Sequence, residues 1–156
     1  MLVLADKGDP TTCRNLVRGQ ISNGAGLAKL CQMIEAQGGD SEALLDYSRF
    51  ARARCSFEVR AKASGWITKM DTERVGIAAC ELGAGRERVE DAVDPAAGIV
   101  LAHKTGEYVE EGELLATLYS SSLKRMYEGE LILREAYRWG DEAPVRTPHF
   151  LARVSA

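Results

Sequence analysis

The stretch GIVLAHKTGEYVEEGELLATLYS, residues 98–120, holds two apolar runs separated by two glycine-containing turns. Residues 98–103 are nearly continuous in apolar side chains, and residues 113–119 carry the second run, so both predict strands. Gly106 and Gly112 mark the turns between them, because glycine adopts the positive φ that tight turns require. Short strands joined by such turns are typical of an antiparallel or mixed sheet.

The residues before this stretch predict two more strands and a helix. Residues 55–60 alternate apolar and polar side chains, and residues 65–70 predict a second short strand. A helix follows, with Asp71 as its N-cap and Gly83 at the left-handed position beyond its end. Its apolar stripe lies at helical spacing and consists of Val75, Ala78, Ala79 and Leu82.

The residues after the stretch predict one more helix. Ser120–Ser122 offers hydroxyl caps for a helix over about residues 123–137, and Pro144 and Pro148 bracket a short closing segment. Together with the strands, this helix makes residues 51–156 an α+β domain with a mixed or antiparallel sheet.

Residues 1–50 predict helices. The first five residues are apolar with no capping residue ahead of them, which favours the tail of a helix that begins earlier. Two amphipathic helices follow, and their apolar stripes are Leu16, Val17 and Ile21 in the first and Leu27, Leu30, Cys31 and Ile34 in the second. Residues 40–54 are polar and predict a solvated linker with one helical turn. The chain therefore predicts a helical segment ahead of the α+β domain.

Composition restricts the classes of partner. The chain has 20 Lys and Arg residues against 23 Asp and Glu residues, a net charge of −3, and its basic residues are scattered along the sequence among acidic ones. This mixing gives no positive stripe for a phosphate backbone, so we expect no nucleic-acid partner. An apolar run of about 18 residues and a secretory signal are both missing, so we expect no membrane partner and a cytoplasmic location. The four cysteines form no C-x-x-C pair, which argues against a zinc ribbon.

Several strings match one known family, in the same order along the chain. They are MLVLADKG at 1–8, EAQGGD at 35–40, SGWITKMD at 64–71, GIAACELGAGR at 76–86 and VEDAVDPAAGIVLAHKTGEYVEEGELLATLYS at 89–120. On these strings the chain resembles the pyrimidine-nucleoside phosphorylases, among them the thymidine phosphorylases. The resemblance covers nearly all of this chain but only about the last third of the family's length.

The resemblance implies a two-part organisation. Residues 1–50 would be the last helices of the large α/β domain that binds phosphate. Residues 51–156 would be the C-terminal domain, with a hammerhead-like sheet related to biotinyl and lipoyl modules. The family's reaction is the reversible phosphorolysis of nucleosides, so the implied partners are phosphate and a pyrimidine nucleoside of the thymidine or uridine type. The family pairs through an N-terminal helical domain, so the full-length enzyme would be a homodimer, and no cofactor is implied.

The family's catalytic motifs do not occur in this sequence. Phosphorolysis needs an anion cradle and donors that stabilise the charge growing on the leaving base. The family supplies them from a Gly-Lys-Ser/Thr loop, a Ser-Ser-Arg stretch and a Gly-Gly-Thr-x-Asp-Lys context, none of which is present. The nearest strings, Lys104–Gly106 and Ser120–Lys124, predict turn and helix-cap chemistry. We therefore expect no catalytic residue and no metal site here, and no activity from this chain alone.

One element of the site remains in the sequence. In related enzymes the loop after the Leu-Gly-Ala-Gly-Arg motif faces the cleft and orders as the domains close, and here that loop spans residues 83–91. The resemblance thus makes Gly83, Gly85 and Arg86 candidate residues of a cleft-closing loop. The alternative is that Arg86 only complements the dipole at the end of the preceding helix.

Two further functions are compatible with the sequence. A carrier domain is suggested by the spacing of Gly106, Gly112 and Leu118 and by Lys69-Met70, but Lys69 precedes a helix rather than standing at a hairpin tip. A non-catalytic structural or interaction protein is the other alternative.

Overall fold

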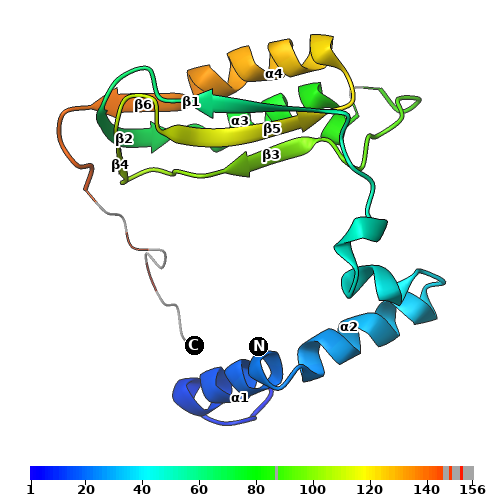
Figure 1. The fold of residues 1–156 in the computed structure, drawn as a ribbon. Helices are drawn as coiled ribbons and strands as arrows, with labels where there is room; N and C mark the ends of the chain where they lie inside the picture. Colours follow the sequence, from blue (N-terminus) through cyan, green and yellow to red (C-terminus); the bar gives the residue numbers. More distant parts are fainter. Residues whose placement is uncertain (87, 146–147, 149–151, 153–156) are drawn as a thin grey trace. The chain divides into compact units, whose positions relative to one another are not determined.

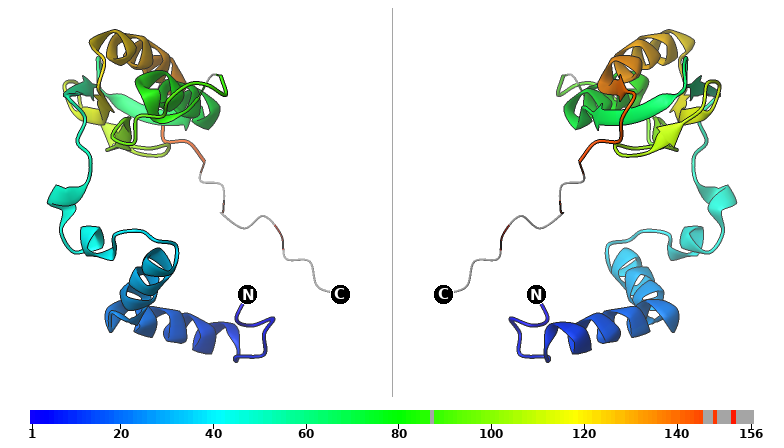
Figure 2. Two further views of the ribbon diagram at one scale, coloured as in Figure 1. Left: turned by 90° about the vertical axis from the view of Figure 1, so that its right-hand side faces the viewer. Right: turned by 90° about the vertical axis from the view of Figure 1, so that its left-hand side faces the viewer.

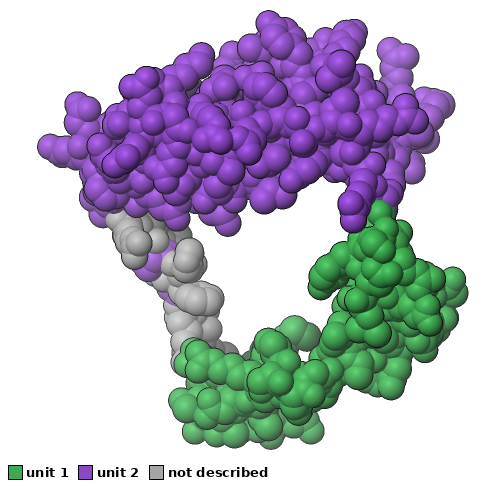
Figure 3. Space-filling view, in the orientation of Figure 1, with its two compact units in different colours: residues 1–50 green, residues 51–156 purple. Residues whose placement is uncertain are grey.

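The chain divides into two compact units, residues 1–50 and residues 51–156, coloured green and purple in Figure 3. The structure is a computed structural model that describes residues 1–86, 88–145, 148 and 152. Most of the closing segment expected between and after Pro144 and Pro148 lies outside the described residues.

The first unit consists largely of helices, as predicted, but residues 2–6 form turns instead of the expected tail of a helix. Helix α1 spans Pro10–Ser22 and begins at Asp9, whose carboxylate accepts a 2.7 Å hydrogen bond from the Thr12 N–H. Helix α2 spans Ala25–Ala36. The linker contains two short 3₁₀ turns, Ser41–Leu44 and Tyr47–Arg49, where the sequence predicted one. Each turn is capped by the aspartate that precedes it, and the second turn forms because its own aspartate is present.

The apolar faces of α1 and α2 are not covered within the first unit. Among residues 1–50, all of which are described, Cys13 is the only buried residue. Side chains predicted to form apolar stripes are instead between about two fifths and three quarters exposed: Leu16, Val17, Ile21, Leu27 and Leu30. Apolar faces of this size in a folded protein normally contact another surface.

The second unit is built on two three-stranded sheets, and every strand pairing in them is antiparallel (Figure 1). The first sheet has the order β1-β5-β3, with β1 at Cys55–Arg60, β5 at Leu114–Ser120 and β3 at Gly98–Leu101. The second has the order β4-β2-β6, with β4 at Tyr108–Val109, β2 at Gly65–Met70 and β6 at Tyr137–Gly140. With two helices added, this unit confirms the predicted α+β class and its antiparallel sheet.

Helices α3, Thr72–Ala79, and α4, Leu123–Ala136, pack side by side against the strands (Figures 1 and 2). Gly129 permits this close approach, because a Cβ there would lie 2.8 Å from Leu82 Cγ. The core between helices and strands is fully buried at Val59, Ile67, Ala78, Leu82, Leu118 and Leu133.

The last predicted helix is confirmed to within one residue, but the strand that follows it was missed. Helix α4 ends at Ala136, and Tyr137 begins strand β6, which pairs with β2. Tyr137 and Trp139 are residues that strands favour, and Met70 and Ile67 are their partners in β2. Two-residue β4 was also missed, because the sequence interpretation assigned Tyr108 and Val109 to a turn.

Candidate functional site

The predicted loop begins in a five-residue turn, Cys80–Ala84, that continues from α3. Gly83 has φ = +112° in this turn and is buried, so the left-handed position predicted for it is confirmed. Its carbonyl accepts a 2.9 Å hydrogen bond from the Asp94 N–H. A Cβ on Gly83 would lie 3.3 Å from Arg125 Nη1, the movable end of a long side chain, and 3.4 Å from Asp94 Cβ. The positive φ, rather than a lack of space, therefore favours glycine here.

Gly85 is required for a different reason. Its backbone is extended, with φ = −130° and ψ = 179°, a conformation open to any residue. A side chain at Gly85 would however overlap the thiol of Cys80, which lies directly against it. The two glycines therefore fix the path of the chain into Arg86 through local packing.

Arg86 is exposed, and no hydrogen bond or ion pair joins it to another described residue. Glu87, its neighbour in the predicted loop, lies outside the described residues. On the far side of that position, the Arg88 N–H donates a 2.9 Å hydrogen bond to the Asp91 carboxylate. The structure thus places Gly83 beside Arg125 at the start of α4 and Gly85 against Cys80, and it leaves Arg86 exposed.

A hollow of about 190 Å³ lies beside Gly83. The Ser120 hydroxyl donates a 2.7 Å hydrogen bond to the Leu82 carbonyl, and the Ser122 hydroxyl accepts one from the Arg125 N–H. The serine string therefore caps α4, as the sequence predicted. Asp94 also lines the hollow. Hydrogen bonds from the Ser121 hydroxyl and then from the Ala96 N–H hold the pKa of Asp94 below its usual value, so its side chain is a carboxylate at neutral pH. A negative Asp94 opposes a second anion at this place.

The other nearest string, Lys104–Gly106, is also turn chemistry. Gly106 has φ = +91°, and the Thr105 hydroxyl accepts a 2.9 Å hydrogen bond from the Met70 N–H. The Lys104 N–H donates to Glu107, and this hydrogen bond is the main reason that the pKa of Glu107 is lowered. These groups are engaged in holding the turn.

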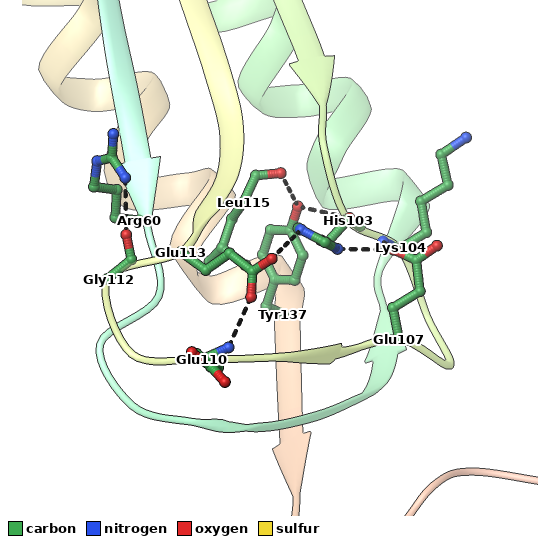
Figure 4. A network of polar contacts seen from close by, with 9 residues as sticks. All are labelled: Arg60, His103, Lys104, Glu107, Glu110, Gly112, Glu113, Leu115 and Tyr137. Carbon is green, nitrogen blue, oxygen red and sulfur yellow. Dashed lines mark hydrogen bonds and ion pairs between the residues drawn. The ribbon is translucent and has the colours of Figure 1, made fainter.

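A polar network links this turn to the next one (Figure 4). The His103 ring lies between two carboxylates, with Nδ1 3.1 Å from Glu107 and Nε2 3.1 Å from Glu113. Tyr137 adjoins the network, and its single O–H is shared between the carbonyls of His103, 3.3 Å away, and Leu115, 3.4 Å away. Burial, together with the charge of Glu107, raises the pKa of Tyr137 to about 12, so this donor stays protonated at neutral pH. Because these groups bond one another, the network holds the turn at residues 104–107 against the turn at residues 110–113.

A second hollow, of about 320 Å³, lies where the two sheets meet. Its lining residues are Arg60, Lys62, Ala63, Leu115, Arg134, Tyr137 and Trp139. Sequence reasoning missed this hollow, because its cations and aromatic rings come from two segments that are far apart in the sequence and share no motif. We call it the β6 pocket.

Metal-binding clusters and membrane-spanning helices are both absent from the described residues. Within residues 1–86, 88–145, 148 and 152, no three His, Cys, Asp or Glu side chains are placed to hold a metal ion. In the same residues, no helix is both long enough and apolar enough to cross a bilayer.

Comparison with known proteins identifies what the second unit is similar to. Residues 66–138 match the family model described as the pyrimidine nucleoside phosphorylase C-terminal domain. The pyrimidine-nucleoside phosphorylases of Staphylococcus aureus strains USA300 and NCTC 8325 / PS 47 are each 41% identical over 122 residues. These residues are 78% of this chain and 28% of each relative, so the chain spans little more than a quarter of the relatives' length.

Proposed function

This chain belongs to the pyrimidine-nucleoside phosphorylase family through its C-terminal domain, and on that premise we propose that it is the C-terminal part of such an enzyme. The proposed reaction is the reversible phosphorolysis of thymidine- or uridine-type nucleosides to a free base and a sugar 1-phosphate. The observation that carries the proposal is the 41% identity over 122 residues, which extends well beyond the matched domain model.

The two units take different parts in this proposal. Residues 51–156 are the C-terminal domain, and residues 1–50 are the last helices of the large phosphate-binding domain. The exposed apolar faces of α1 and α2 support this role for residues 1–50, because a preceding part of the same domain would cover them. Dimerisation of the full-length enzyme would involve its N-terminal domain, and a cytoplasmic location is the setting we propose.

The loop at Gly83, Gly85 and Arg86 is the part of the site that this chain contributes. We assign it the role of closing over the substrate cleft, with Arg86 reaching bound phosphate or nucleoside. One feature supports the assignment: Arg86 is exposed, and its guanidinium has no partner among the described residues. Such a cation can bind an anion without breaking an ion pair to any described residue.

The 156-residue chain alone has no phosphorylase activity in this proposal, because the sequence contains none of the family's anion-cradle motifs. The direct assay is incubation of the purified chain with thymidine or uridine and phosphate, followed by measurement of free base. Release of base above background would overturn this part.

A chimera tests the activity itself. The 122 matched residues of the Staphylococcus aureus enzyme are replaced by those of this chain, and base release from thymidine and uridine is measured. We expect phosphorolysis by the chimera and none by the same enzyme lacking the segment. A folded chimera, shown by circular dichroism, that releases no base would refute the proposal.

A further inference from the structure

The β6 pocket lies apart from the Gly83–Arg86 loop and has a defined set of walls. It forms between the β1–β2 turn at Lys62 and Ala63, the C-terminal end of α4 at Arg134, and strand β6. Its volume of about 320 Å³ is at the lower end of the range for small-molecule sites. It therefore suits a compact ligand.

Two of the three cations at the pocket are held in place. Arg60 Nη1 donates a 2.8 Å hydrogen bond to the Gly112 carbonyl, as Figure 4 shows, and Arg60 also pairs with Glu58. Arg134 Nε donates to Glu130 at 2.8 Å, and its Nη1 donates to the Arg60 carbonyl at 3.1 Å. These bonds fix the guanidinium groups as walls of the pocket.

The third cation, Lys62, supplies an uncompensated charge. The pocket lining has three cations, Arg60, Lys62 and Arg134, and two of them pair with carboxylates, so one positive charge is left over. Lys62 is exposed, and no carboxylate of the described residues lies within ion-pair distance of it. A negatively charged ligand would complete the pair without displacing an internal partner.

The aromatic wall provides a stacking surface. Tyr137 and Trp139 occupy one face of β6, with ring centroids 6.1 Å apart and planes 26° apart. Tyr137 is buried and its hydroxyl is fully engaged, so its ring is a rigid floor. Trp139 is 42% exposed, which leaves indole surface open beside the cations. Planar rings stack on such surfaces with little dependence on their substituents.

From this combination we propose that the β6 pocket binds a small planar aromatic ring that carries a carboxylate or phosphate group. The ring stacks against Trp139, and the anionic group pairs with Lys62. This site is independent of the proposed phosphorolysis. Its ligand would act as an effector that binds away from the Gly83–Arg86 loop.

Calorimetric titration of the full chain tests the proposal with four probes. Uridine 5′-monophosphate has both a ring and a phosphate, orotate has a ring and a carboxylate, uridine lacks the charge, and ribose 5-phosphate lacks the ring. We expect binding of one or both of the first two, at least tenfold tighter than binding of either of the last two. Absence of binding by both charged aromatic probes would overturn the proposal. Equal binding of uridine 5′-monophosphate and ribose 5-phosphate would also overturn it, because it would show attraction of phosphate alone.

Variants locate the site. Lys62→Gln should weaken binding about tenfold, and Trp139→Leu by a similar factor, whereas Trp139→Phe keeps a ring and should lose less. Lys69→Gln is the matched control, because Lys69 is an exposed lysine of β2 outside the pocket lining, and it should bind normally. If Trp139→Leu does not fold, the exposed Lys62 carries the test. Unchanged affinity in Lys62→Gln would refute the proposal.

Discussion

Replacing Gly129 by alanine tests the close contact between α4 and Leu82, the residue just before the Gly83 loop. In a helix interior, alanine is favoured over glycine by about 1 kcal/mol, so propensity alone predicts stabilisation. Packing predicts the reverse, since the new Cβ would lie 2.8 Å from Leu82 Cγ and 3.3 Å from the Ala78 carbonyl oxygen. Leu82 is fully buried, and its branch carbon cannot swing away, so overpacking should cost about 2–3 kcal/mol. The expected net effect is a loss of about 1–2 kcal/mol.

Gly76→Ala is the matched control, because Gly76 lies inside α3 and a Cβ there would meet nothing within 4 Å. This variant should gain about 0.5–1 kcal/mol. Urea unfolding followed by tryptophan fluorescence measures both, since the only two tryptophans, Trp66 and Trp139, lie in residues 51–156 and report on the second unit. A Gly129→Ala protein as stable as Gly76→Ala would refute the packing of α3 against α4.

Three further predictions concern the loop, the first unit and acid stability. In the chimera, Arg86→Ala should lower kcat/KM roughly ten- to a hundredfold if the guanidinium contacts the substrate, and it should change the unfolding free energy by less than about 0.5 kcal/mol. Unchanged kinetics would mean that Arg86 only complements the dipole of the preceding helix. Hydrogen exchange of the isolated chain should show residues 1–50 less protected than residues 99–118, and equal protection in a monomeric sample would contradict the uncovered faces of α1 and α2. The pKa of Asp94 and of Glu107 is lowered in the folded state, so their stabilisation is present above the ordinary values of 3.8 and 4.5 and is lost as pH falls through the folded values. Unfolding free energies measured down to pH 3 should fall less steeply in Glu107→Gln.

Local sequence patterns predicted most of the fold, because they depend on neighbouring residues. Helical spacing located α1, α2 and α3, and the glycine turns located β3 and β5. Strand β6 was missed because Tyr137 follows α4 without a breaking residue, and its pairing with β2 is a long-range contact. The β6 pocket could not be predicted for the same reason. Lys62 and Trp139 are far apart in sequence and approach only when the second sheet forms.

The loop shows how far a motif can support a function. Gly83 is explained by its positive φ, and Gly85 by the thiol of Cys80 beside it. Both glycines would therefore be needed even if nothing bound here, and their presence is no evidence for a ligand. Arg86 differs, since no contact among the described residues explains an arginine at that position. An exposed arginine that contacts no described residue loses rotamer entropy when it binds, so a bound anion would have to offset that cost. The role proposed for the loop therefore depends on Arg86, and the kinetic and stability effects of Arg86→Ala, measured together, separate binding from dipole stabilisation.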